Sequence, residues 1–438
     1  MDHSHKPFRR RKRYSGLLLA GLVLAYPGYT LAWKKNDAQS SIGLRPQPVA
    51  VFGADERVPL PPAYRDLKNK MGLLFNPRSH MVCTAFCVAP DTIATAGHCL
   101  FRVAGESAPQ ISEFWFARNY DAVRDYARVA GHTSGAAAQH VLSGAATLNM
   151  RPPIDATKDW AIVRLERAIC TLGVLPVRPL PTEQIMAAAA AKQVFQVSYH
   201  RDFTPWKLAF TKPCEITRNF DGAEWKTIAG DFSDPDALLL HTCDTGGASS
   251  GSPLLMETEK GPEVIGINVG TYVQSKVEMQ EGEVVRRFKS ETVANTGVSA
   301  TTFAAKLEAF RRANILSTGA EIREMQTALK RLNFYDGPVD STYSPALRSA
   351  IEAFEKDQGV TVTGLATHAL LKRLHGAALE KGKTRPTKGK TTDLADPARA
   401  ARPAASAPRP TGVLRPMLVG ASVRAAEKPQ PRPAAGAG

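Results

Sequence analysis

From residue 51 to about residue 300, the hydrophobic pattern is one of short apolar runs. Examples lie at 81–88, 161–165, 194–197 and 264–269, and Gly, Pro, Asn and Asp residues separate them. Short apolar runs bounded by turn residues are typical of strands in an all-β barrel or sandwich, and they argue against βαβ units. The pattern therefore predicts a mainly β domain over this part of the chain.

The pattern becomes helical after residue 300. Phe303, Leu307 and Phe310 recur at helical spacing behind Ser299 and Thr301, which are residues that cap helices. We expect one helix over 301–315 that closes the β domain.

A separate helical unit follows at 320–376. It carries three apolar stripes, and a turn-rich loop at 335–340 separates the first two of them. A unit of this length predicts three short helices around a small core. The stripes consist of Ile322, Met325, Leu329 and Leu332, then Leu347, Ile351 and Phe354, then Leu365, Ala369 and Leu370.

Charge is concentrated at the two ends of the chain. The protein has 438 residues and a formal net charge of +15, of which residues 1–35 contribute +7 and residues 381–438 contribute +9. The intervening body is therefore close to neutral, which disfavours nucleic-acid binding by a folded basic face. The segment 381–438 is rich in Pro, Ala and Arg, so we expect a disordered tail.

The N-terminal segment has the composition of a secretory signal. A basic run at 9–13 precedes an apolar core at 16–26 and a small residue at Ala32. The apolar core is shorter than the ~20 residues that span a bilayer. We expect a signal peptide over 1–32 and a flexible lead over 33–47, with a periplasmic or secreted protein. An uncleaved membrane anchor is the alternative.

Three residues stand in contexts that suit acyl-transfer chemistry. His98 lies in Thr-Ala-Gly-His-Cys, Asp159 precedes an apolar strand, and Ser250 lies in Ser-Ser-Gly-Ser-Pro. A serine hydroxyl needs a base to become a nucleophile, and a histidine base needs a carboxylate to hold its tautomer. We expect Ser250 to be the nucleophile, His98 the general acid/base and Asp159 the orienting carboxylate.

Small residues surround the proposed nucleophile. They permit a sharp turn that points consecutive backbone N–H groups inward, so the amides of Ala248 and Ser250 are the expected oxyanion hole. Ser249 and Ser252 are rival nucleophiles, and the Gly-Ser-Pro run after Ser250 favours that residue.

These motifs resemble those of secreted bacterial trypsin-like serine proteases. The order His, Asp, Ser is that of the chymotrypsin fold, and the Ser-Gly-Ser-Pro ending is closest to the glutamyl-endopeptidase branch. The resemblance covers residues 48–315. It implies two six-stranded antiparallel β-barrels with the triad between them.

The resemblance also gives expectations for the six cysteines. It implies that Cys83 and Cys99 pair beside the catalytic histidine and that Cys214 and Cys243 close a loop ahead of the serine. The remaining two, Cys87 and Cys170, form either a third disulfide or two buried thiols.

The chain departs from the trypsin pattern at two positions. Ser249 stands where trypsins have an Asp that pairs with a freed N-terminal amine, so the nucleophile loop must be held in another way. Ala248 stands where Gly is usual, and a Gly-only backbone conformation there would be strained.

Substrate specificity rests on three pocket candidates. Asp244 lies six residues before Ser250, where trypsin-type enzymes place the acid that attracts Lys or Arg, although a role in loop structure is the alternative. Asn268 and Gly270 lie in a segment that resembles the strand forming one wall of the primary pocket.

The helical unit resembles the peptidoglycan-binding domain of cell-wall hydrolases. The resemblance runs from Leu329 to Gly364, with Ser341 and Ser344 at two positions where that family has Gly. It implies a peptidoglycan partner for residues 320–376. A retained three-helix module without a glycan function is the alternative.

Together these features indicate an exported serine endopeptidase held at the cell wall. Its partners would be protein or peptide substrates and peptidoglycan, with no nucleic acid, and a membrane only if the N-terminal segment is uncleaved. The mechanism requires no cofactor and no metal. A catalytically inactive protease fold that serves as a wall-associated binding protein is the alternative, while no carboxylate pair indicates a glycosidase.

Overall fold

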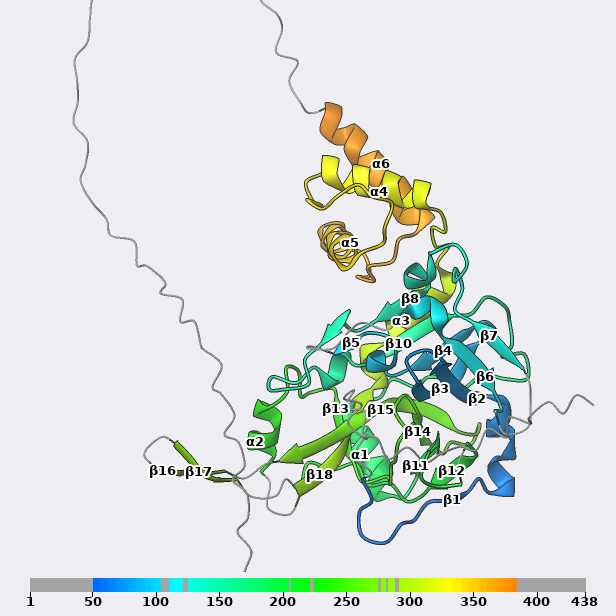
Figure 1. The fold of residues 1–438 in the computed structure, drawn as a ribbon, viewed down its shortest axis with the longest axis vertical. Helices are drawn as coiled ribbons and strands as arrows, with labels where there is room; N and C mark the ends of the chain where they lie inside the picture. The colour runs from blue at the N-terminus through cyan, green and yellow to red at the C-terminus, as the bar shows by residue number, and fades with distance from the viewer. Residues whose placement is uncertain are drawn as a thin grey trace, which may run out of the picture. The chain divides into compact units, whose positions relative to one another are not determined.

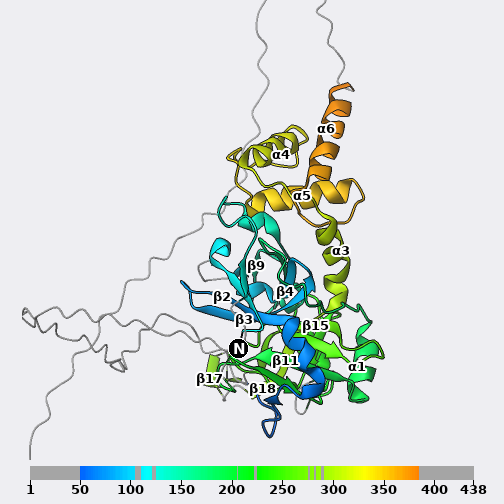
Figure 2. The ribbon, with the colours of Figure 1, turned by 90° about the vertical axis from the view of Figure 1, so that its right-hand side faces the viewer.

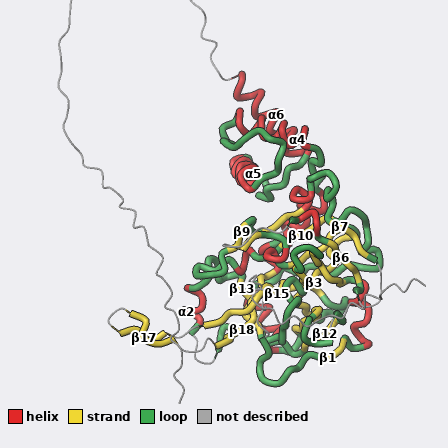
Figure 3. The backbone as a smooth tube through the Cα atoms, in the orientation of Figure 1, coloured by secondary structure: helices red, strands yellow, loops and turns green. Residues whose placement is uncertain are grey.

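The computed structural model describes part of the chain, shown as a ribbon in Figures 1 and 2 and as a tube in Figure 3. The predicted signal peptide and flexible lead lie outside the described residues, as does the predicted tail from residue 384 onward. The described residues are 50–103, 110–120, 125–204, 206–220, 224–274, 277–280, 283–287 and 291–383.

Seven antiparallel strands form a first curled sheet in the order β7-β6-β2-β3-β4-β10-β8 (Figure 1). The central strand β3 is rich in β-branched and apolar residues, and its last seven residues are all buried. The strands are β2 (Met71–Asn76), β3 (Met81–Ala89), β4 (Thr92–Thr95), β6 (Trp115–Arg118), β7 (Tyr126–Arg128), β8 (Val141–Ser143) and β10 (Ala161–Arg164).

A second antiparallel sheet has the order β1-β12-β11-β14-β15-β18-β13. One hydrophobic core cluster contains side chains from both sheets, including Phe86 and Ile162 of the first and Phe195 and Val298 of the second. The strands are β1 (Val58–Pro59), β11 (Val194–Tyr199), β12 (Leu208–Thr211), β13 (Leu238–His241), β14 (Pro253–Met256), β15 (Glu263–Gln274) and β18 (Glu291–Ser299).

The expectation of a mainly β fold followed by helices is confirmed. Each sheet has seven strands rather than the expected six, and three of the edge strands are short: β1 has two residues, and β7 and β8 have three each. Two further strand pairs lie outside the sheets, formed by β5 (Arg102–Val103) with β9 (Thr147–Leu148) and by β16 (Val277–Gln280) with β17 (Glu283–Arg287).

The β domain also contains short helices that the apolar pattern did not predict. Two are α-helical, and the last four residues of α1 are alanine, a strong helix former. They are α1 (Thr182–Ala190) and α2 (Trp225–Gly230), together with the 3-10 helices η1 (Pro62–Asn69), η2 (Gly97–Cys99), η3 (Ile111–Glu113), η4 (Ala137–His140) and η5 (Ala156–Lys158).

The predicted closing helix is present as η6 (Ala300–Thr302) and α3 (Ala304–Arg312). The hydroxyl of Ser299 accepts a hydrogen bond from the amide of Thr301, so Ser299 caps this segment. Phe303 and Phe310 are fully buried, which fixes the helix to the core of the β domain.

Three helices form the C-terminal unit, namely α4 (Gly319–Arg331), α5 (Pro345–Asp357) and α6 (His368–Lys383) (Figure 2). Thr318 and Glu321 form a reciprocal capping box at the start of α4. The first two predicted stripes supply most of its core. The third stripe was partly wrong, because Ala369 is exposed and Leu365 belongs to the core of the β domain, while Leu370, Leu371 and Leu374 fill the small core.

Among the described residues, no helix is both long enough and apolar enough to cross a membrane.

Candidate active site

The pairing of β4 with β10 brings His98 and Asp159 together. Ala161 pairs with Thr95, so continuing this antiparallel register places Asp159 opposite the turn that carries His98. Gly97 permits the close approach, because a Cβ at this position would lie 3.1 Å from Asp159 Oδ1. Two residues that are 61 positions apart in the sequence therefore meet at the ends of neighbouring strands.

Both carboxylate oxygens of Asp159 are used by His98. Oδ1 accepts from the backbone amide of His98 at 2.7 Å, and Oδ2 lies 2.8 Å from the ring Nδ1. An ionised carboxylate only accepts hydrogen bonds, so Nδ1 carries the proton and the neutral ring has its lone pair on Nε2. This is the tautomer that a general base requires. Asp159 is 1 % exposed and His98 is 7 % exposed.

A disulfide stands directly beside this histidine. Cys83 of β3 and Cys99 are bonded, and their sulfurs lie within 4.8 Å of a ring nitrogen of His98. These sulfurs are joined to each other, so they are not thiolate metal ligands. The bond ties the histidine turn to the central strand of the first sheet.

The other two disulfides complete the set of cysteines. Cys214 pairs with Cys243 as expected, and Cys87 pairs with Cys170, which decides the choice that the sequence left open.

Ser250 lies in the loop between β13 and β14 and is 6 % exposed. Its carbonyl accepts from the amide of Thr84 at 2.9 Å, and Thr84 follows Cys83 in β3. The next residue, Gly251, has φ +84°, and a Cβ there would overlap Thr95 Oγ1 and the carbonyl of Thr84. Only glycine therefore lets the serine loop pack against the strands that carry the histidine turn.

The peptide groups Gly247–Ala248 and Ser249–Ser250 are both anchored through their carbonyl oxygens. The carbonyl of Gly247 accepts from the amide of Arg201 at 2.8 Å, and the carbonyl of Ser249 accepts from Asn268 Nδ2 at 3.1 Å. In a trans peptide the N–H points opposite to the C=O. Because these two carbonyls are anchored, the amides of Ala248 and Ser250 point away from Arg201 and Asn268. Within the described residues, neither of these amides donates to a protein acceptor.

Ala248 adopts a conformation that favours glycine, with φ +81°. Its carbonyl accepts from Thr84 Oγ1 at 2.8 Å, and the residue is 4 % exposed. The expected strain at this position is therefore present, and surrounding hydrogen bonds hold the loop in spite of it.

The three pocket candidates occupy different positions. The carboxylate of Asp244 accepts from the amides of Phe52 at 2.9 Å and Glu56 at 2.7 Å, and it is 2 % exposed. Asn268 is fully engaged behind Ser249, whereas Gly270 is partly exposed at a register shift in β15. Both carboxylate oxygens of Asp244 thus bind the backbone of residues 52–56.

Sequence reasoning missed Thr84, Arg201 and His241 as supports of the site. Thr84 had one local signal, its place next to Cys83. Arg201 and His241 had none, because their partners, Gly247 and Asn268, are far from them in the sequence.

A curled pair of β-sheets with a paired aspartate and histidine beside a serine turn defines the class of a chymotrypsin-like fold. Residues 83–267 match the family model described as "Trypsin-like peptidase domain", and residues 318–374 match the one described as "Putative peptidoglycan binding domain". The chain therefore carries a trypsin-like peptidase domain followed by a peptidoglycan-binding domain, and the resemblance seen in its motifs is confirmed.

Solved structures similar to this chain include two proteases. "Structure of Glu endopeptidase in complex with MPD" has 16 % identity, a TM-score of 0.39 and coverage of 60 % of this chain and 99 % of that one. "Crystal structure of a thermostable serine protease AL20 from extremophilic microoganism" has 16 % identity, a TM-score of 0.35 and coverage of 55 % and 95 %.

Curated relatives match a short part of the chain. "Localization factor PodJL" of Caulobacter vibrioides, from strains NA1000 / CB15N and ATCC 19089 / CIP 103742 / CB 15, is 41 % identical over 58 residues. The match covers 13 % of this chain and about 6 % of the length of those proteins.

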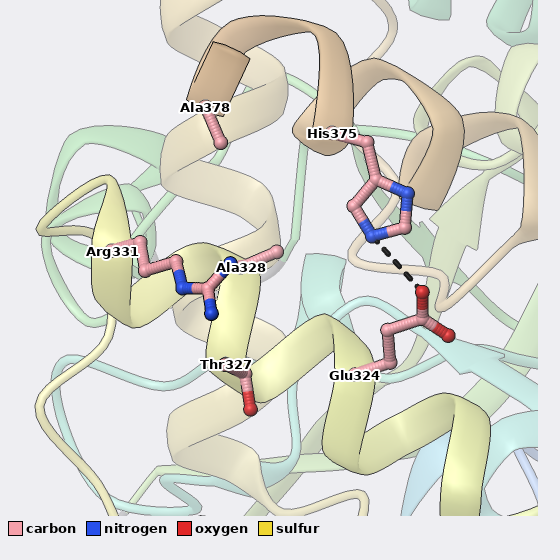
Figure 4. A pocket seen from close by; sticks show the side chains of 6 residues that line it. All are labelled: Glu324, Thr327, Ala328, Arg331, His375 and Ala378. Atoms are coloured by element: carbon pink, nitrogen blue, oxygen red, sulfur yellow. Dashed lines mark ion pairs between the residues drawn. The ribbon is translucent and has the colours of Figure 1, made fainter. Parts of the chain in front are cut away.

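The helical domain has a small pocket between α4 and α6 (Figure 4). In it, His375 Nε2 lies 3.1 Å from Glu324 Oε1, and both side chains are about half exposed. Thr327, Ala328, Arg331 and Ala378 line the rest of it.

Proposed function

We propose that this protein is a serine endopeptidase in which Ser250, His98 and Asp159 form the catalytic triad. The observation that carries the proposal is the double hydrogen bond from His98 to the buried Asp159, which leaves the ring in the tautomer of a base. The match of residues 83–267 to trypsin-like peptidases supports it.

The proposed reaction proceeds through an acyl-enzyme. His98 Nε2 removes the hydroxyl proton of Ser250 as Oγ bonds to the substrate carbonyl carbon, and the carbonyl oxygen becomes an oxyanion. The amides of Ala248 and Ser250 stabilise that charge, an effect worth ~3 kcal/mol per donor. Collapse of the intermediate expels the amine, which takes the proton from His98. Water then hydrolyses the acyl-enzyme by the same two proton transfers.

A fluorophosphonate probe tests this proposal, because it bonds covalently to an activated serine. The wild-type protein should be labelled, and Ser250→Ala should abolish labelling while circular dichroism stays unchanged. Ser252→Ala is the matched control and should keep the label. A wild-type protein that never reacts would favour the inactive binding protein, and labelling of Ser250→Ala would move the nucleophile to another serine.

We further propose that the protein is exported. The support is the set of six cysteines, all paired among the described residues, together with the composition of residues 1–32. Fractionation of cells that express the full chain, followed by N-terminal sequencing, tests this. Recovery of the uncleaved chain with reduced cysteines in the cytoplasm would contradict it.

We also propose that residues 318–374 bind peptidoglycan, which rests on the domain match. Full-length Ser250→Ala protein, which cannot digest itself, should sediment with purified peptidoglycan at low salt. The same chain ending at residue 316 should remain in solution. Equal sedimentation of the two would remove the wall-binding role.

A further inference from the structure

Asn268 lies in β15 directly behind the nucleophile loop and is 2 % exposed. Its backbone is paired with the loop on both sides, because Gly251 N donates to its carbonyl at 2.8 Å and its own amide donates to Ser252 O at 2.9 Å. These two bonds fix the position from which its side chain extends.

The side chain of Asn268 can take only one orientation. A carbonyl oxygen only accepts hydrogen bonds, so the group 3.1 Å from Ser249 O is the Nδ2 amide. Oδ1 then faces His241 Nε2 at 3.1 Å and accepts from it. The contacts of the two neighbours therefore determine which way the amide is turned.

His241 holds this orientation as a neutral ring. It is fully buried, and burial lowers its pKa to about 4, so the ring carries one proton at neutral pH. That proton must be on Nε2 to donate to Asn268. Nδ1 has no hydrogen-bond partner among the described residues, so no contact there favours the other tautomer.

The hydrogen bond from Asn268 sets the orientation of the peptide that joins Ser249 to Ser250. Its carbonyl points back to Asn268, so its N–H, which belongs to Ser250, points forward to where an oxyanion would form. We propose that Asn268 is a positioning residue that aims the Ser250 N–H, with His241 as the group that keeps the amide of Asn268 turned the right way.

This inference rests on the proposed protease function and replaces the expectation that Asn268 contacts substrate. Both atoms of its amide are already used inside the protein. A trypsin holds this loop with an Asp that pairs with an N-terminal amine. Here the residue before the nucleophile is Ser249, whose hydroxyl lies 3.4 Å from Asn268 Nδ2.

The test is Asn268→Asp, which keeps the shape and the acceptor for His241 but turns an oxygen toward Ser249 O. The kcat for a peptide amide should fall about 10- to 100-fold, which is less than the complete loss of one oxyanion donor. KM should stay within about threefold. Affinity for a peptide trifluoromethyl ketone, which forms an oxyanion on Ser250, should fall in parallel with kcat.

Two further variants separate positioning from stability. Asn76→Asp places the same change at a buried amide in β2, and its kcat per folded molecule should be unchanged. If Asn268→Asp does not fold, His241→Leu supplies the test, with an expected loss in kcat of about 3- to 10-fold.

The outcomes are distinguishable. Wild-type kcat in folded Asn268→Asp, or in folded His241→Leu where the first variant does not fold, overturns the inference, as does a changed preference for the residue before the cleaved bond with kcat retained. A wild-type protein without protease activity would instead overturn the proposed function.

Discussion

Ala248 offers a direct test of how the nucleophile loop is held. Its φ of +81° is a conformation that costs a residue with a side chain about 1–2 kcal/mol. Changing it to glycine removes that cost. The change also adds about 0.5–1 kcal/mol of chain entropy in the unfolded state and removes a buried methyl group worth about 0.8 kcal/mol.

These contributions nearly cancel, so Ala248→Gly should leave the free energy of unfolding within about 1 kcal/mol of the wild type. Ala127→Gly is the matched control, because Ala127 is fully buried in β7 and is not among the residues with positive φ. That control lacks the relief of strain and should lose about 1.5 kcal/mol. Ala248→Val should lose more than the control, since a β-branched residue strongly disfavours positive φ.

Thermal unfolding of the three variants measures the difference. In a domain of this size 1 kcal/mol shifts Tm by roughly 2–4 °C, so Ala127→Gly should unfold several degrees below Ala248→Gly. The oxyanion donor is a backbone amide, so kcat of Ala248→Gly should stay within about threefold. Equal losses of stability at the two alanines would refute the reasoning that Ala248 is strained.

Three other predictions follow from the site. Asp159→Asn should lower kcat about 10⁴-fold, because an amide no longer enforces the base tautomer of His98. Pre-steady-state kinetics with a chromogenic ester should show slow acylation. A loss in kcat of less than about tenfold would contradict the triad. Asp244→Ala should lower Tm without changing cleavage-site preference in a peptide library, and a selective loss of cleavage after Lys or Arg would show a pocket role instead. Burial lowers the pKa of His200 to about 3 and that of His241 to about 4, so as pH falls below about 6.5 the unfolded state takes up protons first and stability should decline. Urea unfolding at pH 7, 6 and 5 should show that the free energy of unfolding falls less steeply with pH in His241→Gln than in the wild type, by on the order of 1 kcal/mol per pH unit. Identical slopes in the two proteins would contradict a buried neutral ring at His241.

The fold class could be predicted because its signals are local. Apolar runs at 81–88 and 264–269 became β3 and β15, and helical stripes became α4 and α5. The strand and helix periods are properties of neighbouring residues, so one sequence contains them. The hydrophobic pattern does not indicate α1, although its alanines favour helix, because the segment lacks a wide apolar stripe.

The site was predictable only where chemistry and local motif coincide. His98 and Ser250 stand in distinctive runs of small residues, whereas the partners of Asp244 lie 192 and 188 positions away in the sequence. The role of Asn268 likewise depends on His241 in another strand. Contacts of this kind follow from sheet topology, which a single sequence does not encode position by position.

Hydrogen bonds from several separate segments hold the loop at residues 244–252, which carries Ser250. Asp244, at the start of the loop, binds the backbone of residues 52–56. Ala50 and Thr245 also exchange backbone hydrogen bonds of 3.1 and 2.9 Å. Thr84 holds the middle of the loop from the first sheet, and Asn268 holds the peptide before the serine from the second. These hydrogen bonds involve different groups of the loop, namely the Asp244 carboxylate, the Ala248 carbonyl and the Ser249 carbonyl, so none can substitute for another.

This division has a mechanistic consequence. A single ion pair makes the loop depend on one event, the release of an N-terminal amine. Supports spread over both sheets instead make the loop depend on the folding of the whole β domain. The strained φ of Ala248 is compatible with such an arrangement, because its local cost is about 1–2 kcal/mol. The hydrogen bonds from these three segments are worth about 1 kcal/mol each, so together they exceed that cost. The direction of the Ser250 N–H is therefore set by the fold itself.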